Sequence, residues 1–192
     1  MKKTKILILC ECAVMLALAT VLSMITLWKM PFGGSLTLLS MLPVCLIGLR
    51  HGVKWGFFTA FVYSVIQLML SIGEVVSWGL TPVVLVACMV LDYLASYTCL
   101  GICSLFRGGK TAGKRRLNMC FGIGLAMVAR FLCHFVSGVT LWSESAAGTG
   151  YSAVVYSILY NGAFMLPELI LTVVGASIIF SVPQMIKMVE KK

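Results

Sequence analysis

The sequence contains few charged residues: Asp, Glu, Lys and Arg together make up 11% of its 192 residues. Soluble globular domains are about 25% charged, whereas this chain is 60% hydrophobic, with a mean hydropathy of +1.04. It also has no polar stretch long enough to form a second domain. The composition therefore excludes a water-soluble globular protein and predicts an all-α integral membrane protein with a single domain, residues 1–192.

Several catalytic motifs are also missing from the sequence. It has no Walker A motif, so we do not expect this chain to hydrolyse ATP itself. It has no His-Glu-x-x-His motif, no cluster of His and Cys typical of a metal site, and no recognisable Ser/His/Asp arrangement. The sequence therefore predicts no catalytic residues and no metal site. Six helices without repeated halves do not suggest an inverted-repeat transporter either.

Eight cysteines are present, and all of them fall within apolar segments. This placement argues against a disulfide framework, which is typical of small secreted domains. We expect these residues to act as small buried hydrophobic side chains.

Long apolar segments predict six transmembrane helices, because a bilayer core needs about 20 mostly apolar residues. The predicted ranges are 6–28, 36–49, 53–72, 78–106, 117–142 and 152–182. The second range is short and contains Pro43, so we expect that helix to be tilted or incomplete.

The basic residues predict the orientation of the bundle. All Lys and Arg residues other than Lys29 and Arg130 lie at the termini or in the turns on one side of a six-helix zigzag. Basic residues accumulate on the cytoplasmic side of membrane proteins. Both termini are therefore expected in the cytoplasm. The net charge of +9 is explained by topology and does not indicate nucleic-acid binding.

One apolar segment, residues 130–142, carries unusual polar and aromatic residues. His134, Gly138 and Trp142 are spaced i, i+4, i+8, so they share one face of a helix. That face could line a pocket for a flat, polar or cationic molecule. Alternatively, Trp142 is an anchor at the membrane interface, Gly138 is a helix-packing contact, and His134 is a satisfied interior group.

Asp92 is the strongest candidate among the ionisable residues inside the membrane. It lies well inside an apolar segment, with no basic residue within a helical turn. Such groups cost free energy and mark functional sites. Asp92 could neutralise a cationic ligand or accept hydrogen bonds from an amino group, with Tyr93 adding an aromatic ring beside it. The structural alternative is an internal ion pair between Asp92 and Arg130.

Two further polar residues are expected at the same depth on the last helix, Tyr156 and Asn161. Asn161 can donate and accept at once, which suits the edge of a heterocycle; alternatively, it forms a hydrogen bond between helices. Glu168 follows Pro167, and we favour a structural role for it, such as pairing with Arg130.

Together these features resemble the ThiT (YuaJ) family of thiamine transporters. The resemblance includes the 91–93 and 130–142 segments, Tyr156 with Asn161, and the loop 30–35, and it covers nearly the whole chain. The family comprises substrate-binding S-components of bacterial energy-coupling factor (ECF) transporters. The resemblance thus implies a multi-pass protein of the bacterial cell membrane that captures thiamine at the outer face. It also implies a transmembrane coupling subunit and two ATPase subunits as partners, and no cofactor.

The resemblance also implies roles for individual residues. The implied thiamine-binding set is Asp92, Tyr93, His134, Gly138, Trp142, Tyr156 and Asn161. Asp92 stands where the family pattern has Glu, so its shorter reach could make the contact water-mediated. A capping aromatic from the outer loops is expected to be Trp28 or Trp78. The small-xxx-small face of Ala13 and Ala17 is implied to contact the coupling subunit, although such faces usually serve internal packing.

Three other functions stay open at this point. The chain could be an S-component for another vitamin or heterocycle, although Asp92 would repel the carboxylate of biotin. It could be a membrane enzyme that uses Asp92 and His134 as an acid/base pair. It could also be a structural subunit in which Asp92 and Arg130 form an ion pair.

Overall fold

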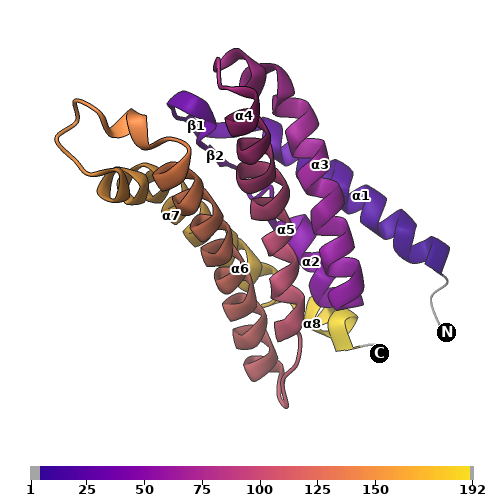
Figure 1. The fold of residues 1–192 in the computed structure, drawn as a ribbon. Helices are drawn as coiled ribbons and strands as arrows, with labels where there is room; N and C mark the ends of the chain where they lie inside the picture. Colours follow the sequence, from indigo (N-terminus) through magenta and orange to yellow (C-terminus); the bar gives the residue numbers. More distant parts are fainter. Residues whose placement is uncertain (1–4, 191–192) are drawn as a thin grey trace.

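The computed structural model describes residues 5–190, which form a helical bundle with one small hairpin (Figure 1). Lys2, Lys3, Lys191 and Lys192 of the predicted basic set lie outside the described residues. The elements in chain order are α1 (Lys5–Met24), β1 (Thr26–Lys29), η1 (Pro31–Gly33), β2 (Ser35–Thr37), α2 (Leu42–His51), α3 (Val53–Ser77), α4 (Pro82–Cys88), η2 (Met89–Ala95), α5 (Ser96–Thr98), η3 (Cys99–Phe106), α6 (Ala112–Thr140), η4 (Ser143–Ala146), α7 (Ala153–Ile179) and α8 (Pro183–Glu190).

Five helical segments among the described residues are long and apolar enough to cross a membrane. They are α1, α3, the continuous segment Pro82–Phe106, α6 and α7. The predicted second span, 36–49, is different: α2 has 10 residues, and at 1.5 Å per residue it covers about half of a bilayer core. The prediction of six full spans is therefore replaced by five long helices and one short apolar helix.

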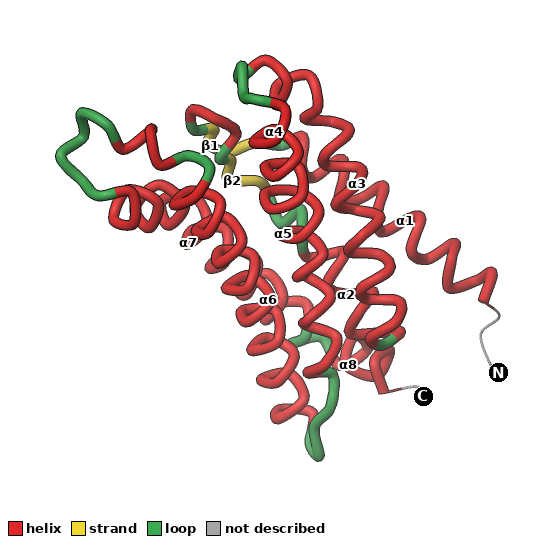
Figure 2. Tube along the Cα trace, viewed as in Figure 1, coloured by secondary structure: helices red, strands yellow, loops and turns green. Residues whose placement is uncertain are grey.

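The end of the predicted first span and the start of the predicted second span belong to a β-hairpin instead of to helices. The predicted first helix, 6–28, ends at Met24, and β1 then pairs with β2 in antiparallel fashion (Figure 2). Pro31 begins a tight 3₁₀ turn, and Gly33 adopts a φ of 91°, which glycine reaches without strain. The turn expected at residues 30–35 is therefore the connection of this hairpin.

Non-helical backbone is costly within a membrane unless it is buried in protein or lines a cavity. This hairpin and the turn after it meet that condition in part, because half of the residues from Thr26 to Met41 border the main cavity of the bundle. Thr37 and Ser40 are buried. The hairpin therefore closes one end of the bundle, and α2 completes the crossing below it.

The two ends of the bundle differ. The hairpin and the turns after α3 and α6 lie at one end, whereas the turn at 107–111 and α8 lie at the other (Figure 1). The core between them is apolar and includes Tyr63, Leu100, Ile123 and Met127. α1 buries little of its surface, with Cys12 and Ala19 as its buried residues. The residues that line the main cavity lie mostly at the hairpin end.

Candidate ligand-binding site

A cavity of about 360 Å³ lies at the hairpin end of the bundle. Its walls come from α1, the hairpin, α3, the segment Pro82–Phe106, α6 and α7, so residues from most of the chain meet there. The predicted residues that line it are Trp78, Asp92, Tyr93, His134, Gly138, Trp142, Tyr156 and Asn161. The structure thus gathers eight predicted residues around one space.

Asp92 lies in η2, a π-helical turn within an otherwise α-helical segment. π-turns occur frequently at functional sites. The hydroxyl of Ser96 donates to the carbonyl oxygen of Asp92 at 2.5 Å and reaches that of Tyr93 at 3.4 Å. These contacts satisfy carbonyl groups within the wider turn, so the turn is held by its own sequence.

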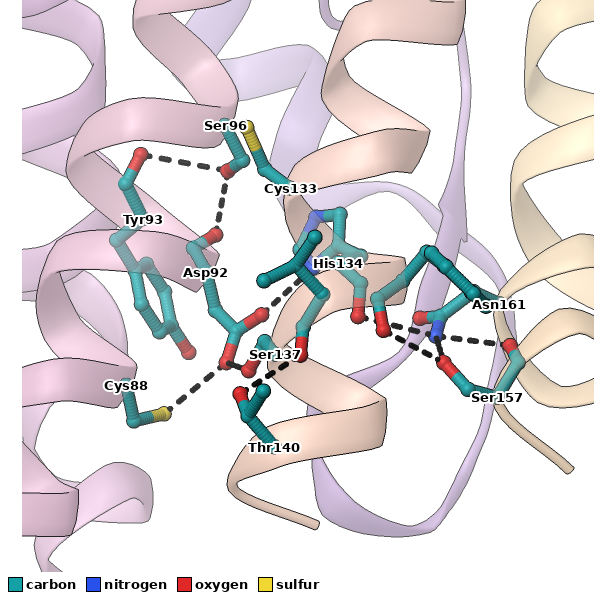
Figure 3. Close-up of polar contacts among 12 residues, drawn as sticks. Cys88, Asp92, Tyr93, Ser96, Cys133, His134, Ser137, Thr140, Ser157 and Asn161 are labelled. Atoms are coloured by element: carbon teal, nitrogen blue, oxygen red, sulfur yellow. Dashed lines mark hydrogen bonds and ion pairs between the residues drawn. The ribbon is translucent and has the colours of Figure 1, made fainter. Parts of the chain in front are cut away.

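The carboxylate of Asp92 contacts three side chains (Figure 3). His134 Nδ1 lies 3.0 Å from Oδ1, and the hydroxyl of Ser137 donates to Oδ2 at 2.6 Å. The thiol of Cys88 also approaches Oδ2, at 3.3 Å. The alternative of an Asp92–Arg130 ion pair is wrong, because Arg130 pairs with Glu168 at 3.3 Å.

His134 has one ring nitrogen without a partner. Its Nε2 atom is buried and makes no hydrogen bond among the residues that the structure describes. A carboxylate can only accept, so Nδ1 carries the proton that bonds to Asp92. In the neutral ring Nε2 is then an acceptor. Because His134 borders the cavity, this acceptor is close enough to be a candidate partner for a ligand N–H group.

Aromatic rings surround the outer part of the cavity. Trp78 and Trp142 meet edge to face, with ring centroids 5.3 Å apart and an interplanar angle of 80°. Tyr156 and Tyr160 stack with centroids 6.0 Å apart. Trp28 is different: it is 50% exposed on β1 and does not border the cavity. The cavity therefore has Trp78, and not Trp28, as its second tryptophan.

Gly138 permits a close approach of α6 and α7. A Cβ atom at this position would lie 2.2 Å from Ser157 Oγ and 3.3 Å from Asn161 Nδ2. The packing interpretation of Gly138 is therefore visible in the structure, together with its place in the cavity wall.

Asn161 also joins these two helices. Its Nδ2 atom donates to the backbone oxygen of His134 at 3.3 Å and to that of Ser157 at 3.0 Å (Figure 3). Each of its hydrogen bonds among the described contacts uses Nδ2. Asn161 thus has the structural role considered from the sequence, and its Oδ1 atom is the acceptor that a ligand could use.

Sequence reasoning missed several residues of the site. Ser137 is one helical turn from His134, and Cys88 is one turn before Asp92, so helical spacing could have found both. Tyr160 and Phe164 follow Tyr156 at the same interval and line the cavity. The contribution of Thr37 could not be read in this way, because it depends on the fold of the hairpin.

The predicted docking residues lie away from the cavity. Ala13 and Ala17 are exposed on α1, whereas the internal face of α1 carries Cys12 and Ala19. The small-xxx-small pair therefore does not serve packing within this chain. It leaves an open apolar surface on which another helix could lie.

Comparison with known proteins agrees with this architecture. Residues 9–188 match the family described as thiamine transporter protein (Thia_YuaJ). The chain is 29% identical over 189 residues to the thiamine transporter ThiT of Bacillus subtilis (strain 168), which covers 93% of each protein. It is 27% identical over 154 residues to the ThiT of Lacticaseibacillus paracasei, covering 76% of this chain and 73% of that protein.

A solved structure has the same fold. The structure of ThiT from Listeria monocytogenes superimposes with a TM-score of 0.76 at 24% identity, covering 96% of this chain and 99% of the other. The relatives are bacterial, and the five long apolar helices indicate a multi-pass protein of the bacterial plasma membrane. The match over residues 9–188 shows that the chain belongs to the family of thiamine transporter proteins.

Proposed function

We propose that this protein captures thiamine in the cavity beneath the hairpin for uptake into the cell. The observation that carries the proposal is the Asp92–His134 pair within a membrane-embedded cavity that aromatic rings surround. Thiamine combines a permanently cationic thiazolium ring with a flat aminopyrimidine. A carboxylate, a buried acceptor and several aromatic faces match these properties.

The site offers a distinct partner for each part of thiamine. His134 Nε2 is the acceptor for the amino group of the pyrimidine, and Asn161 Oδ1 can accept a second hydrogen bond at the ring edge. Trp142, Trp78 and Tyr156 supply faces that attract the thiazolium by about 0.5–2 kcal/mol each, depending on desolvation.

Asp92 acts mainly through His134 and through its charge. Both of its oxygens already have partners on α6, so little of the carboxylate remains for direct contact. This arrangement fits the shorter Asp at a position where the family pattern has Glu. Its negative charge still favours a cation in a site of low dielectric constant.

The direction of capture follows from the charge distribution. The described basic residues of the turn at 107–111 and of α8 lie at the end opposite to the hairpin. By the positive-inside rule we infer that this end faces the cytoplasm and that the hairpin faces outward, which agrees with the predicted cytoplasmic termini. Thiamine would thus enter from outside the cell.

Energy for uptake is proposed to come from partner subunits. This chain has no Walker A motif, and S-components of ECF transporters work with a coupling subunit and two ATPases. The exposure of Ala13 and Ala17 on α1 supports docking of the coupling subunit there, because small residues allow close approach of helices in a membrane.

The test is a titration of the purified, detergent-solubilised protein with thiamine, followed by intrinsic tryptophan fluorescence. Because Trp142 and Trp78 line the cavity, saturable quenching is expected. Biotin and riboflavin serve as competitors that represent other vitamins. The proposal fails if thiamine causes no saturable change, or if either competitor binds more tightly. Recovery of unchanged thiamine separates binding from an enzymatic reaction.

A further inference from the structure

The turn between β2 and α2 is attached to an ion pair inside the bundle. The hydroxyl of Thr37 donates to Glu168 Oε1 at 2.6 Å, and the other oxygen of Glu168 lies 3.3 Å from Arg130 Nη1. Thr37 is 7%, Arg130 3% and Glu168 1% exposed. A hydrogen bond to a buried carboxylate is among the stronger kinds in proteins. The last residue of the hairpin is thus hydrogen-bonded to a buried carboxylate.

A second hydroxyl fixes the direction of this contact. Ser40 Oγ lies 2.7 Å from Thr37 Oγ1. Thr37 has one hydroxyl proton, and it uses that proton in its hydrogen bond to Glu168. The hydroxyl of Ser40 is therefore the donor to Thr37. The chain Ser40 to Thr37 to Glu168 therefore has one consistent arrangement of protons, with the ion pair at its end.

The backbone of this turn is strained, which indicates that its surroundings hold it. Leu39 has a φ of 57°, a left-handed conformation that non-glycine residues rarely adopt. Such conformations persist where surrounding contacts determine them. The Leu39 side chain lies against Gly175 of α7, where an added Cβ would come within 2.8 Å of it. Residues 37–40 are thus attached to α7 at two points.

Two other polar contacts of the hairpin, among the residues that the structure describes, lie at exposed positions. Lys29 pairs with Glu74 at 2.9 Å, but their side chains are 58% and 40% exposed. Exposed ion pairs contribute little, because water and salt screen them. Tyr160 donates to the backbone oxygen of Pro31, also at an exposed position. The contact of Thr37 with Glu168, by contrast, is buried.

We propose that Thr37 is a positioning residue that holds the hairpin closed over bound ligand through Glu168 and Arg130. The inference rests on the proposed function in taking thiamine as that ligand. It gives the Arg130–Glu168 ion pair a role in ligand release, because this pair contacts the hairpin. Asp92 and His134 lie elsewhere in the cavity. Loss of the hydroxyl should loosen the hairpin and shorten the lifetime of the complex.

The test compares Thr37→Val with Thr37→Ser and Thr172→Val. Valine has the shape of threonine without the hydroxyl, whereas serine keeps it. Thr172 is a buried threonine that donates to the backbone oxygen of Glu168 at 2.7 Å and contributes nothing to the cavity wall. It therefore controls for loss of a buried hydroxyl next to the same residue. Thr37→Ala replaces Thr37→Val if the latter does not fold.

Two measurements are made on each variant. Stopped-flow tryptophan fluorescence gives the dissociation rate of thiamine, and hydrogen–deuterium exchange without ligand reports the protection of residues 26–40. Thr37→Val should raise the dissociation rate about tenfold, the factor that corresponds to 1.4 kcal/mol, and should speed exchange in the hairpin. Thr37→Ser and Thr172→Val should resemble the wild type in both.

The outcomes separate this inference from the proposed function. If the wild type does not bind thiamine, the proposed function fails, while exchange still reports the attachment of the hairpin. If hydrogen–deuterium exchange of residues 26–40 were unchanged in Thr37→Val, the proposed attachment of the hairpin by Thr37 would be overturned. Faster exchange with an unchanged dissociation rate would overturn its role in release, as would an equal rise in that rate in Thr172→Val.

Discussion

The Nδ1 atom of His134 lies 3.0 Å from Oδ1 of Asp92, which joins α6 to the π-helical turn η2. In the neutral ring, the contact places the proton on Nδ1 and leaves the buried Nε2 as an acceptor. Asp92 therefore contributes both a negative charge and the orientation of its neighbour. The first two predictions follow from this division of roles.

Replacing Asp92 with Asn should weaken thiamine binding severely without unfolding the protein. Asn keeps the size of the side chain and an oxygen that can accept from Ser137, but it removes the charge near the cation. Loss of a desolvated charge partner costs about 2–5 kcal/mol. Calorimetric titration and thermal unfolding measure the two effects. Glu144→Gln is the control, since Glu144 carries an acidic charge outside the cavity wall. Unchanged affinity of Asp92→Asn would contradict the assignment.

The acceptor role of His134 predicts discrimination between thiamine and an analogue whose pyrimidine carries an oxygen in place of the amino group. The analogue presents an acceptor to Nε2, and a buried polar group left unpaired costs about 1–3 kcal/mol. In His134→Ala the two ligands should bind with similar, weaker affinities. Competition titrations measure the difference. Equal preference for the two ligands in the wild type would argue against this hydrogen bond.

Trp142 should contribute to binding by stacking on the ligand. Trp142→Ala is expected to weaken affinity by about 1–3 kcal/mol, as seen for bases that stack on aromatic side chains, and Trp142→Phe should lie between. Trp55→Ala is the control, because Trp55 lies on α3 and does not border the cavity. Calorimetric titration of each purified variant with thiamine measures the affinities. Equal affinities in all of them would leave Trp142 as an interface anchor.

Bulky residues on the open face of α1 should block transport but not binding. Ala13→Leu and Ala17→Leu add side chains where the coupling subunit is proposed to approach, so uptake of labelled thiamine should be lost in cells that express the whole complex. Affinity in detergent should stay at the wild-type value, since neither residue touches the cavity. Val83→Leu, on a strongly exposed position of α4, is the control. Full uptake by both α1 variants would rule out this docking face.

Much of the architecture can be predicted from composition and periodicity. A chain with so few charges and such long apolar segments has to satisfy its backbone within a membrane, and helices do this locally. Helical spacing likewise placed His134 and Gly138 on one face, and both border the cavity. The scarcity of ionisable residues inside apolar segments was enough to single out Asp92.

The partners of these residues were decided by tertiary structure. Asp92 and His134 are 42 positions apart, and Thr37 and Glu168 are 131 apart, so no local pattern pairs them. Nor could hydropathy distinguish a helix from a strand at residues 26–28 and 36–37, because the periodicity of such short apolar stretches does not separate the two. The end of the hairpin and the turn after it depend on tertiary contacts, because Thr37 bonds to Glu168 and Leu39 lies against Gly175, both of α7. Composition thus determined that the chain forms helices in a membrane, whereas long-range packing decided which charges meet and where the cavity lies.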